Sequence, residues 1–297
     1  MPDLPATIDS VAAVVPAPNQ IPFFEDLESK APPRRRHLRV QPPLLADLTP
    51  RQRKAVTWGE GPLLVVAGAG TGKTTVLTRR IAWLIAEQRA RPSEILALTF
   101  TERAAAEMQD RVDQLVPYGS TDSVICTFHA FGDRLIREHG LSVGLSDQVA
   151  VLSRPEQVTF LREQLDELPL DRFRPLGDPT RFLSALATHF SRARDEDISP
   201  EHYRASADRL AARAAEDPSD SALVEEAARQ VELAAAYTTY DRLLRAADRI
   251  DFGDQVGLAL RILRDHPDIR AEERSRYRYV LVDAFQDTNH AQFELAR

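Results

Sequence analysis

The stretch AGAGTGKT, Ala67 to Thr74, constrains the fold of this chain more than any other part of its sequence. It follows the apolar run PLLVV and precedes the amphipathic pattern VLTRRIAWLIAEQ, so we expect a buried strand, a turn and a helix. Three glycines permit a turn whose backbone N–H groups converge on phosphate oxygens: Gly68, Gly70 and Gly72. A chance glycine turn would rarely have both the strand and the helix beside it. The sequence therefore predicts a phosphate-binding loop.

The side chains of this loop supply the rest of a nucleotide site. Lys73 would place a cation beside the β- and γ-phosphates, and the Thr74 hydroxyl is a suitable ligand for Mg²⁺. The residues that we expect around the phosphates are Ala67, Gly68, Ala69, Gly70, Thr71, Gly72, Lys73, Thr74 and Thr75. Kinases, GTPases, transporters and motors all use such a loop, so the class of protein depends on the other motifs.

Short apolar runs alternate with helical patterns over much of the chain. EILALTF (94–100) and SVICTF (123–128) are typical of buried parallel strands, and a helical pattern follows each of them. YRYVLVD (277–283) is the last such run. The alternation predicts an α/β fold with a parallel sheet covered by helices on both faces. Only a few residues follow this run and its terminal Asp283, so the sheet domain looks incomplete.

The alternation is interrupted between residues 141 and 234, where alanine, arginine and glutamate recur with helical spacing. We predict four parts: a proline-rich disordered tail (1–46), the first part of the sheet domain (47–140), an inserted all-helical subdomain (141–234) and the remainder of the sheet domain (235–297). Basic residues of the tail and of the insertion are expected to be solvated: Arg34, Arg35, Arg36, His37, Arg39, Arg192 and Arg194.

Composition bounds the environment of the protein. The net charge of −7 gives no overall attraction to nucleic acid, which argues against a passive coating protein. The single cysteine, Cys126, excludes an intramolecular disulfide and is expected to be a small buried apolar residue. The N-terminus lacks a signal-peptide pattern, and no run of about 18 apolar residues occurs. We therefore expect a cytoplasmic protein with no membrane segment.

Further motifs surround the phosphate loop in a fixed order: LTPRQRKAV (48–56), ALTFTERAAAEM (97–108), TFHAFG (127–132), IDFGD (250–254) and VDAFQDTN (282–289). Together they resemble the UvrD/Rep/PcrA-like helicases of superfamily 1, including the related AddA and RecB motors. The resemblance covers the chain from about Leu48 to its end. It implies a RecA-like sheet domain, ATP and Mg²⁺ as cofactors, and single-stranded or partly duplex DNA as a partner.

The resemblance also assigns roles at the nucleotide site. Gln52 would hydrogen-bond the adenine edge, Asp283 would hold Mg²⁺ through its water shell, and Gln286 would sense the γ-phosphate and couple it to DNA. With Lys73, the residues Asp283 and Gln286 are the implied catalytic set. We expect Asp287 and Asn289 to satisfy the local turn.

The implied DNA contacts lie where two strands end: Phe100, Thr101, Thr127, Phe128 and His129. An aromatic ring there can stack on a base, and a hydroxyl can reach a phosphate. Spacing alone instead favours a core position for Phe100, and an isolated histidine such as His129 is usually structural. In IDFGD, the residues Asp251, Phe252 and Asp254 mark kinship with a segment that shapes the DNA path, and we assign them no chemistry.

The chain departs from the family pattern in three places. Ala284 stands where the family carries the glutamate that polarises the attacking water, so we expect ATP to be bound but scarcely hydrolysed. The later motifs and the second RecA-like domain are absent, so unwinding by this chain would need that domain or a partner protein. Thr75 replaces an arginine of many relatives, which would weaken nucleotide contacts modestly.

Two other classes of protein are alternatives to the N-terminal part of a helicase. A non-catalytic ATP-binding module that regulates or scaffolds a partner fits Ala284 and the short chain. A small-molecule kinase would use the phosphate loop, but it leaves ALTFTERAAAEM, TFHAFG and IDFGD unexplained. The leading hypothesis remains the N-terminal ATP-binding part of a 3′–5′ DNA helicase.

Overall fold

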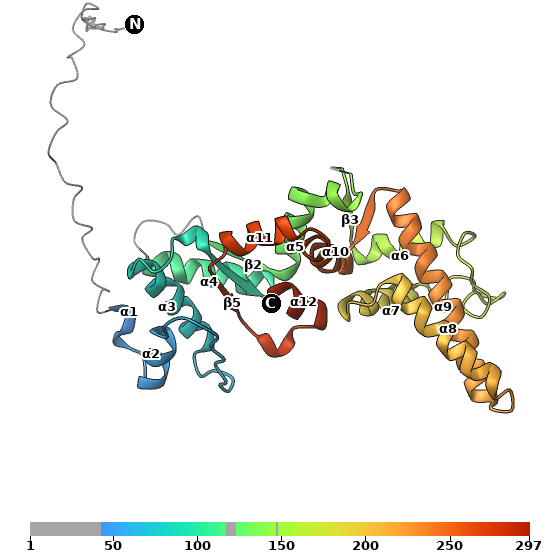
Figure 1. Cartoon of the computed structure of the whole chain (residues 1–297), viewed down its shortest axis with the longest axis horizontal. Helices are drawn as coiled ribbons and strands as arrows, with labels where there is room; N and C mark the ends of the chain where they lie inside the picture. The colour runs from blue at the N-terminus through green and yellow to red at the C-terminus, as the bar shows by residue number, and fades with distance from the viewer. Residues whose placement is uncertain (1–42, 117–122, 147) are drawn as a thin grey trace, which may run out of the picture. The chain divides into compact units, whose positions relative to one another are not determined.

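The computed structural model of the chain describes residues 43–116, 123–146 and 148–297 (Figure 1). Its main sheet has three parallel strands in the order β2 (Val124–Thr127), β1 (Ile95–Thr99) and β5 (Tyr279–Val282). Every residue of the central strand β1 is buried, which is why its sequence is a nearly continuous apolar run. The predicted parallel sheet is confirmed.

Helices cover both faces of this sheet. Successive side chains of a strand point to opposite faces, so Ile95 and Ala97 pack in one core while Leu96 and Leu98 pack in another. The first core is completed by α3 (Lys73–Ala86) and α4 (Glu102–Leu115), and the second by α5 (Phe128–His139), α10 (Phe252–Asp265) and α12 (His290–Ala296). Each fully buried aliphatic side chain stabilises the fold by about 1.5–3 kcal/mol, so both layers hold the sheet firmly.

Residues 62–66, which we expected to form a buried strand ahead of the phosphate loop, form no strand, and this expectation was wrong. Leu64 and Val66 are 73% and 86% exposed. A strand is held in place by hydrogen bonds to a neighbouring strand. Among the described residues, no strand pairs with this run, and β5 pairs only through its edge facing β1. The apolar pattern was therefore insufficient without a partner.

The helical segment, residues 150–251, begins and ends at a second, two-stranded sheet. In it β3 (Ala150–Leu152) pairs in parallel with β4 (Arg249–Asp251), which brings the two ends of the segment together. The helices between them are α6 (Arg154–Glu163), α7 (Leu183–Asp195), α8 (Pro200–Glu216) and α9 (Ser221–Ala246). The rings of Phe190, Tyr237 and Tyr240 lie at the centre of their shared core. The boundary predicted at residues 234 and 235 falls inside α9.

Two short helices precede the phosphate loop, α1 (Pro43–Ala46) and α2 (Pro50–Val56). Because α1 is ordered and Leu44 is buried, the prediction of a disordered tail over 1–46 was wrong for residues 43–46. The rest of that tail, with its basic cluster, lies outside the described residues. The remaining elements are α11 (Pro267–Arg276) and the 3₁₀ turns η1 (Pro92–Glu94), η2 (Gly140–Val143) and η3 (Phe285–Asp287). Across the described ranges, no helix is long and apolar enough to cross a bilayer.

Candidate functional site

The phosphate loop leads directly into the first turn of α3. Gly70 and Gly72 have φ angles of 72° and 88°, a left-handed conformation that favours glycine, and Gly72 is the N-cap of the helix. Lys73 Nζ donates hydrogen bonds to the carbonyl oxygens of Ala67 at 2.9 Å and Gly68 at 3.0 Å. The cation thus lies against the loop at the positive end of the helix dipole, which is a favourable place for phosphate oxygens.

Thr74 and Asp283, which are far apart in the sequence, meet beside this loop. Asp283 directly follows β5, and its backbone N–H donates to the Leu98 carbonyl of β1 at 2.9 Å, which fixes the end of the strand. The Thr74 hydroxyl lies 3.4 Å from Asp283 Oδ2. A hydroxyl and a carboxylate are both hard oxygen ligands of the kind that Mg²⁺ and its water shell prefer. The two residues that we expected to hold Mg²⁺ are therefore neighbours.

Ala284 has a backbone conformation that is unusual for alanine. Its φ of 54° and ψ of 42° are left-handed, which costs a residue with a Cβ about 1–2 kcal/mol. Its N–H donates to Asp283 Oδ1 at 3.0 Å. In the turn that follows, Gln286 Nε2 donates to Asp287 Oδ2 at 3.1 Å, so these two side chains are engaged with each other. No acidic side chain occupies position 284 itself.

Gln52 contacts the phosphate loop from α2. Its Nε2 donates to the Thr71 carbonyl at 3.0 Å, while its Oε1 accepts from the Thr49 N–H at 2.9 Å. The other end of α2 is held by Arg80 of α3, whose guanidinium donates to backbone carbonyls there, including that of Trp58 at 2.8 Å. Burial lowers the pKa of Arg80. Helix α2 is thus held at one end by the phosphate loop and at the other by α3, which places Gln52 beside the loop.

Phe100 and Thr101 lie where β1 ends and α4 begins. The Phe100 ring is 54% exposed, so the core position that its spacing favoured is wrong. An exposed ring at the carboxyl edge of a parallel sheet is free to stack on a base. The Thr101 hydroxyl accepts a hydrogen bond from the Ala104 N–H at 3.1 Å and caps α4.

Thr127 and Phe128 lie inside the protein, which contradicts the DNA contacts expected of them. The Thr127 hydroxyl donates to Glu102 Oε1 at 2.7 Å and accepts from the Ala130 N–H at 3.1 Å, so it caps α5. Phe128 is 1% exposed and packs in the core beneath the sheet. The strand-end pattern identified the junction correctly, but it could not show which side chains turn inward.

His129, the next residue of this motif, stacks on Phe252. Their ring centroids are 3.9 Å apart and the ring planes differ by 23°. Phe252 is 56% exposed, and burial lowers the pKa of His129, which favours the neutral form of its imidazole. From the sequence, Phe252 was expected only to mark kinship with the family segment. Its place at the first turn of α10, directly after β4, is the signal that could have paired it with the motif at the start of α5.

Arg194 is buried, so the solvated position predicted for it was wrong. Its guanidinium contacts Asp251 at 2.8 Å and Asp254 at 2.6 Å and lies over the rings of Tyr237 and Tyr240. Burial raises the pKa of Asp254 to about 7, because desolvation outweighs the attraction of the guanidinium. The two aspartates of IDFGD therefore anchor α10 to α7 of the helical segment.

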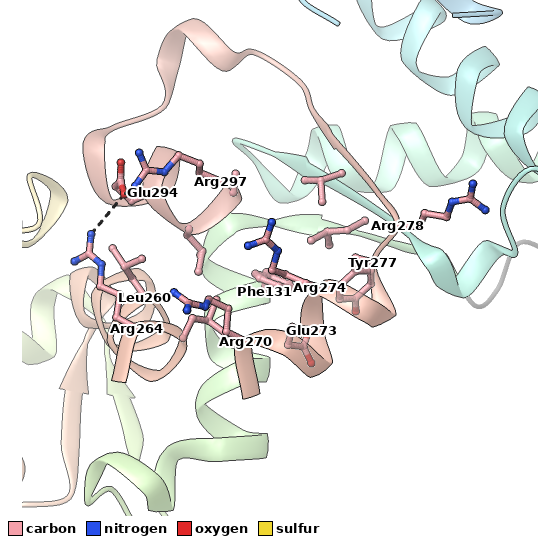
Figure 2. A pocket seen from close by; sticks show the side chains of 15 residues that line it. Phe131, Leu260, Arg264, Arg270, Glu273, Arg274, Tyr277, Arg278, Glu294 and Arg297 are labelled. Atoms are coloured by element: carbon pink, nitrogen blue, oxygen red, sulfur yellow. Dashed lines mark ion pairs between the residues drawn. The ribbon is translucent and has the colours of Figure 1, made fainter. Parts of the chain in front are cut away.

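A cavity of about 620 Å³ opens between α10, α11, α12 and β5 (Figure 2). Its lining includes Leu96 and Val280 of the sheet and the arginines Arg264, Arg270, Arg274, Arg278 and Arg297. Arg264 and Arg297 share Glu294 as an ion-pair partner. None of the described residues that line this cavity belongs to the phosphate loop, so it is separate from the nucleotide site.

The order of these motifs is explained by comparison with known proteins. Residues 48–297 match the protein family described as UvrD/REP helicase N-terminal domain. The chain belongs to this family. The predicted family and its RecA-like α/β fold class are thereby confirmed.

Several members of the UvrD/REP family are clearly similar to this chain. It is 38% identical over 257 residues to the ATP-dependent DNA helicase UvrD1 of Mycobacterium tuberculosis, a match that covers 86% of this chain and 30% of that protein. It is 32% identical over 254 residues to the ATP-dependent DNA helicase PcrA of Bacillus subtilis, covering 86% of this chain and 31% of that protein. The chain thus spans less than a third of the length of these curated relatives.

Proposed function

We propose that this chain is the N-terminal ATP-binding part of an ATP-dependent 3′–5′ DNA helicase or translocase that acts in DNA repair or recombination in the cytoplasm. The observation that carries the proposal is the approach of the Thr74 hydroxyl to within 3.4 Å of Asp283, next to Lys73 on a phosphate loop. Phosphate cradle, cation and metal ligands are the parts that phosphoryl transfer requires. The helicase assignment rests on the similarity to UvrD1 and PcrA.

Each residue of the proposed site would have a separate role in binding ATP. Lys73 would exchange its two carbonyl partners for phosphate oxygens, and the loop N–H groups would complete the cradle. Thr74 and Asp283 would hold Mg²⁺, which when bound neutralises charge on the β- and γ-phosphates. Gln52 would present its amide to adenine from the N-terminal turn of α2, and Gln286 would face the γ-phosphate after leaving Asp287.

Hydrolysis by this chain should be slow because no carboxylate is present at position 284. A general base contributes about 10²–10⁴-fold to a rate, and alanine offers no group that could accept the proton of water. Removal of one negative charge near a triphosphate does not weaken ATP binding and favours it electrostatically. We therefore propose that the chain binds Mg·ATP and retains it largely unhydrolysed.

The test compares this chain with the variant Ala284→Glu, with and without single-stranded DNA. We expect both to bind ATP, turnover near background for the chain itself, and DNA-stimulated turnover only in the glutamate variant. Lys73→Ala is the matched control and should lose ATP binding. Substantial turnover by the unchanged chain would refute the role given to position 284. Absence of ATP binding would refute the proposal as a whole.

The proposed DNA-binding surface comprises Phe100 and the His129–Phe252 pair. Both phenylalanine rings are exposed although large apolar side chains are normally buried, which supports a stacking role. Stacking on an aromatic side chain is worth about 1–3 kcal/mol per base, so Phe100→Ala and Phe252→Ala should each weaken oligo(dT) binding by roughly 5- to 150-fold. Leu176→Ala, at an exposed apolar site of the helical segment, is the control and should bind like the parent chain.

A second motor domain or a partner protein is a further part of the proposal. It could cover the exposed apolar run 62–66, the arginine-lined cavity and the edge of β5 that pairs with no strand among the described residues. The alternative function, a non-catalytic ATP-binding module, is favoured by Ala284 alone. It would be supported if Ala284→Glu remained inactive in the presence of the C-terminal part of a UvrD-type motor.

A further inference from the structure

The last two residues of α7 contact two motifs that the proposed function assigns to different ligands. Arg194 holds the start of α10, where Phe252 faces the proposed DNA strand. Asp195 contacts Asn289, which follows the proposed Mg²⁺ ligand Asp283 by six positions. The C-terminal end of α7 therefore contacts both the segment that follows the proposed Mg²⁺ ligand and the start of α10.

The contact on the strand side is rigid. Asp251 and Asp254 form a capping box at the start of α10, and each also contacts the buried guanidinium of Arg194. Asp251 Oδ2 additionally accepts hydrogen bonds from Gln157 Nε2 at 2.9 Å and from the Tyr240 hydroxyl at 3.1 Å. A buried charge with this many partners cannot shift alone, because any displacement would leave desolvated groups unpaired. The first turn of α10, and Phe252 with it, should follow α7.

On the nucleotide side, a hydrogen bond links α7 to the segment that follows Asp283. Asn289 Nδ2 donates to Asp195 Oδ1 at 2.9 Å, while Asn289 Oδ1 accepts from the Gln292 N–H at 2.8 Å and caps α12. Asn289 thus links the segment that follows Asp283 both to α12 and to α7. A movement of this segment when nucleotide binds would reach α7 through Asp195.

We propose that Arg194 and Asp195 are positioning residues which couple the nucleotide site to the strand-binding pair His129–Phe252. The proposal rests on the proposed function, because it takes ATP and single-stranded DNA as the two ligands. Coupling between sites is carried by contiguous packed side chains and ion-pair networks, and this chain of contacts is continuous from Asn289 to Phe252. Helix α7 of the helical segment would then transmit a change at the nucleotide site to the strand-binding pair.

The experiment measures the affinity of the chain for fluorescein-labelled oligo(dT) with and without Mg·ATP. Slow hydrolysis is an advantage here, because ATP stays intact and the affinities are equilibrium values. In the parent chain we expect Mg·ATP to change the oligo(dT) affinity by about 5-fold or more, in the range usual for linked sites. Asp195→Ala should reduce this change to less than about 2-fold while the affinity for ATP alone stays within about 2-fold.

Two further variants sharpen the test. Asn289→Ser removes the donor to Asp195 but keeps a residue that caps helices well, so it should lose the coupling without losing α12. Combined with Asp195→Ala it should have no additional effect, because the two residues act through one hydrogen bond. Glu196→Ala removes an exposed carboxylate one residue further on and should behave like the parent chain.

The outcomes separate this proposal from the proposed function. If ATP and oligo(dT) both bind but do not affect each other in the parent chain, the coupling proposal is overturned and the proposed function stands. The same conclusion follows if Asp195→Ala retains the full effect of Mg·ATP. If neither ligand binds the parent chain, the proposed function fails and the coupling proposal fails with it.

Discussion

Replacement of Gly132 by alanine should separate the two helices that carry the strand-binding pair. A Cβ at Gly132 in α5 would lie 2.5 Å from the backbone oxygen of Gln255 in α10 and 2.9 Å from its carbonyl carbon. Carbon–oxygen contacts rarely fall below about 3.3 Å, so the helices would have to move apart by roughly 0.8 Å. Overpacking of this kind costs about 1–3 kcal/mol, whereas alanine gains about 1 kcal/mol over glycine in a helix interior. The net loss of stability should be up to about 2 kcal/mol.

The same chain provides a matched control for this substitution. Gly257 lies inside α10, and among the described residues a Cβ there would meet no atom within 4 Å beyond its chain neighbours and the backbone of its own helix. Gly257→Ala should therefore gain the helix preference of about 1 kcal/mol without the packing cost, so the difference between the two variants isolates the helix contact. Urea unfolding followed by circular dichroism gives both free energies of unfolding. Equal stabilisation by the two substitutions would refute the close approach of α5 and α10.

Three further predictions concern backbone strain, buried charge and helix capping. Ala284→Gly should raise the free energy of unfolding by about 0.5–1 kcal/mol, because glycine adopts the left-handed conformation without a Cβ penalty. A loss of stability in urea would contradict the backbone strain inferred at this position. The raised pKa of Asp254, about 7, means that the folded chain keeps a proton which the unfolded chain has released, so this residue makes stability fall as pH rises from about 4 to 7. Asp254→Asn should remove that slope and be more stable relative to the parent at pH 8 than at pH 5 in thermal melts; parallel pH profiles would argue against it. Arg80→Met should lower the free energy of unfolding by about 1.5–3 kcal/mol, because carbonyls at the end of α2 would lose their charged donor. Arg89→Met, which removes a guanidinium stacked on Trp83, should lower it by about 0.5–1 kcal/mol. Similar losses for the two variants in urea would show that the carbonyl contacts of Arg80 contribute little.

The sequence by itself determined the features that depend on neighbouring residues. The phosphate loop is a local arrangement of glycines, a lysine and a threonine, and its spacing is enough to define it. The strands β1, β2 and β5 were predicted because each is a short apolar run, although only the central strand β1 is buried at every position. The order of the motifs identified the family, and the turn role expected for Asn289 is seen in its cap of α12.

Only the tertiary structure decided which side chains meet and which lie inside. Residues 62–66 have an apolar sequence, but no strand in the described part of the chain pairs with them, and a sheet hydrogen bond requires a partner that the local sequence does not contain. An arginine in a helical pattern is expected at the surface, but Arg194 is buried against three acidic side chains from other elements: Asp241, Asp251 and Asp254. Phe128 and His129 are adjacent in sequence, yet one is in the core and the other stacks on Phe252, because the first turn of α5 directs successive side chains to different neighbours. Local patterns define motif chemistry and most of the helices and strands, whereas strand pairing, burial and side-chain contacts are properties of the assembled chain.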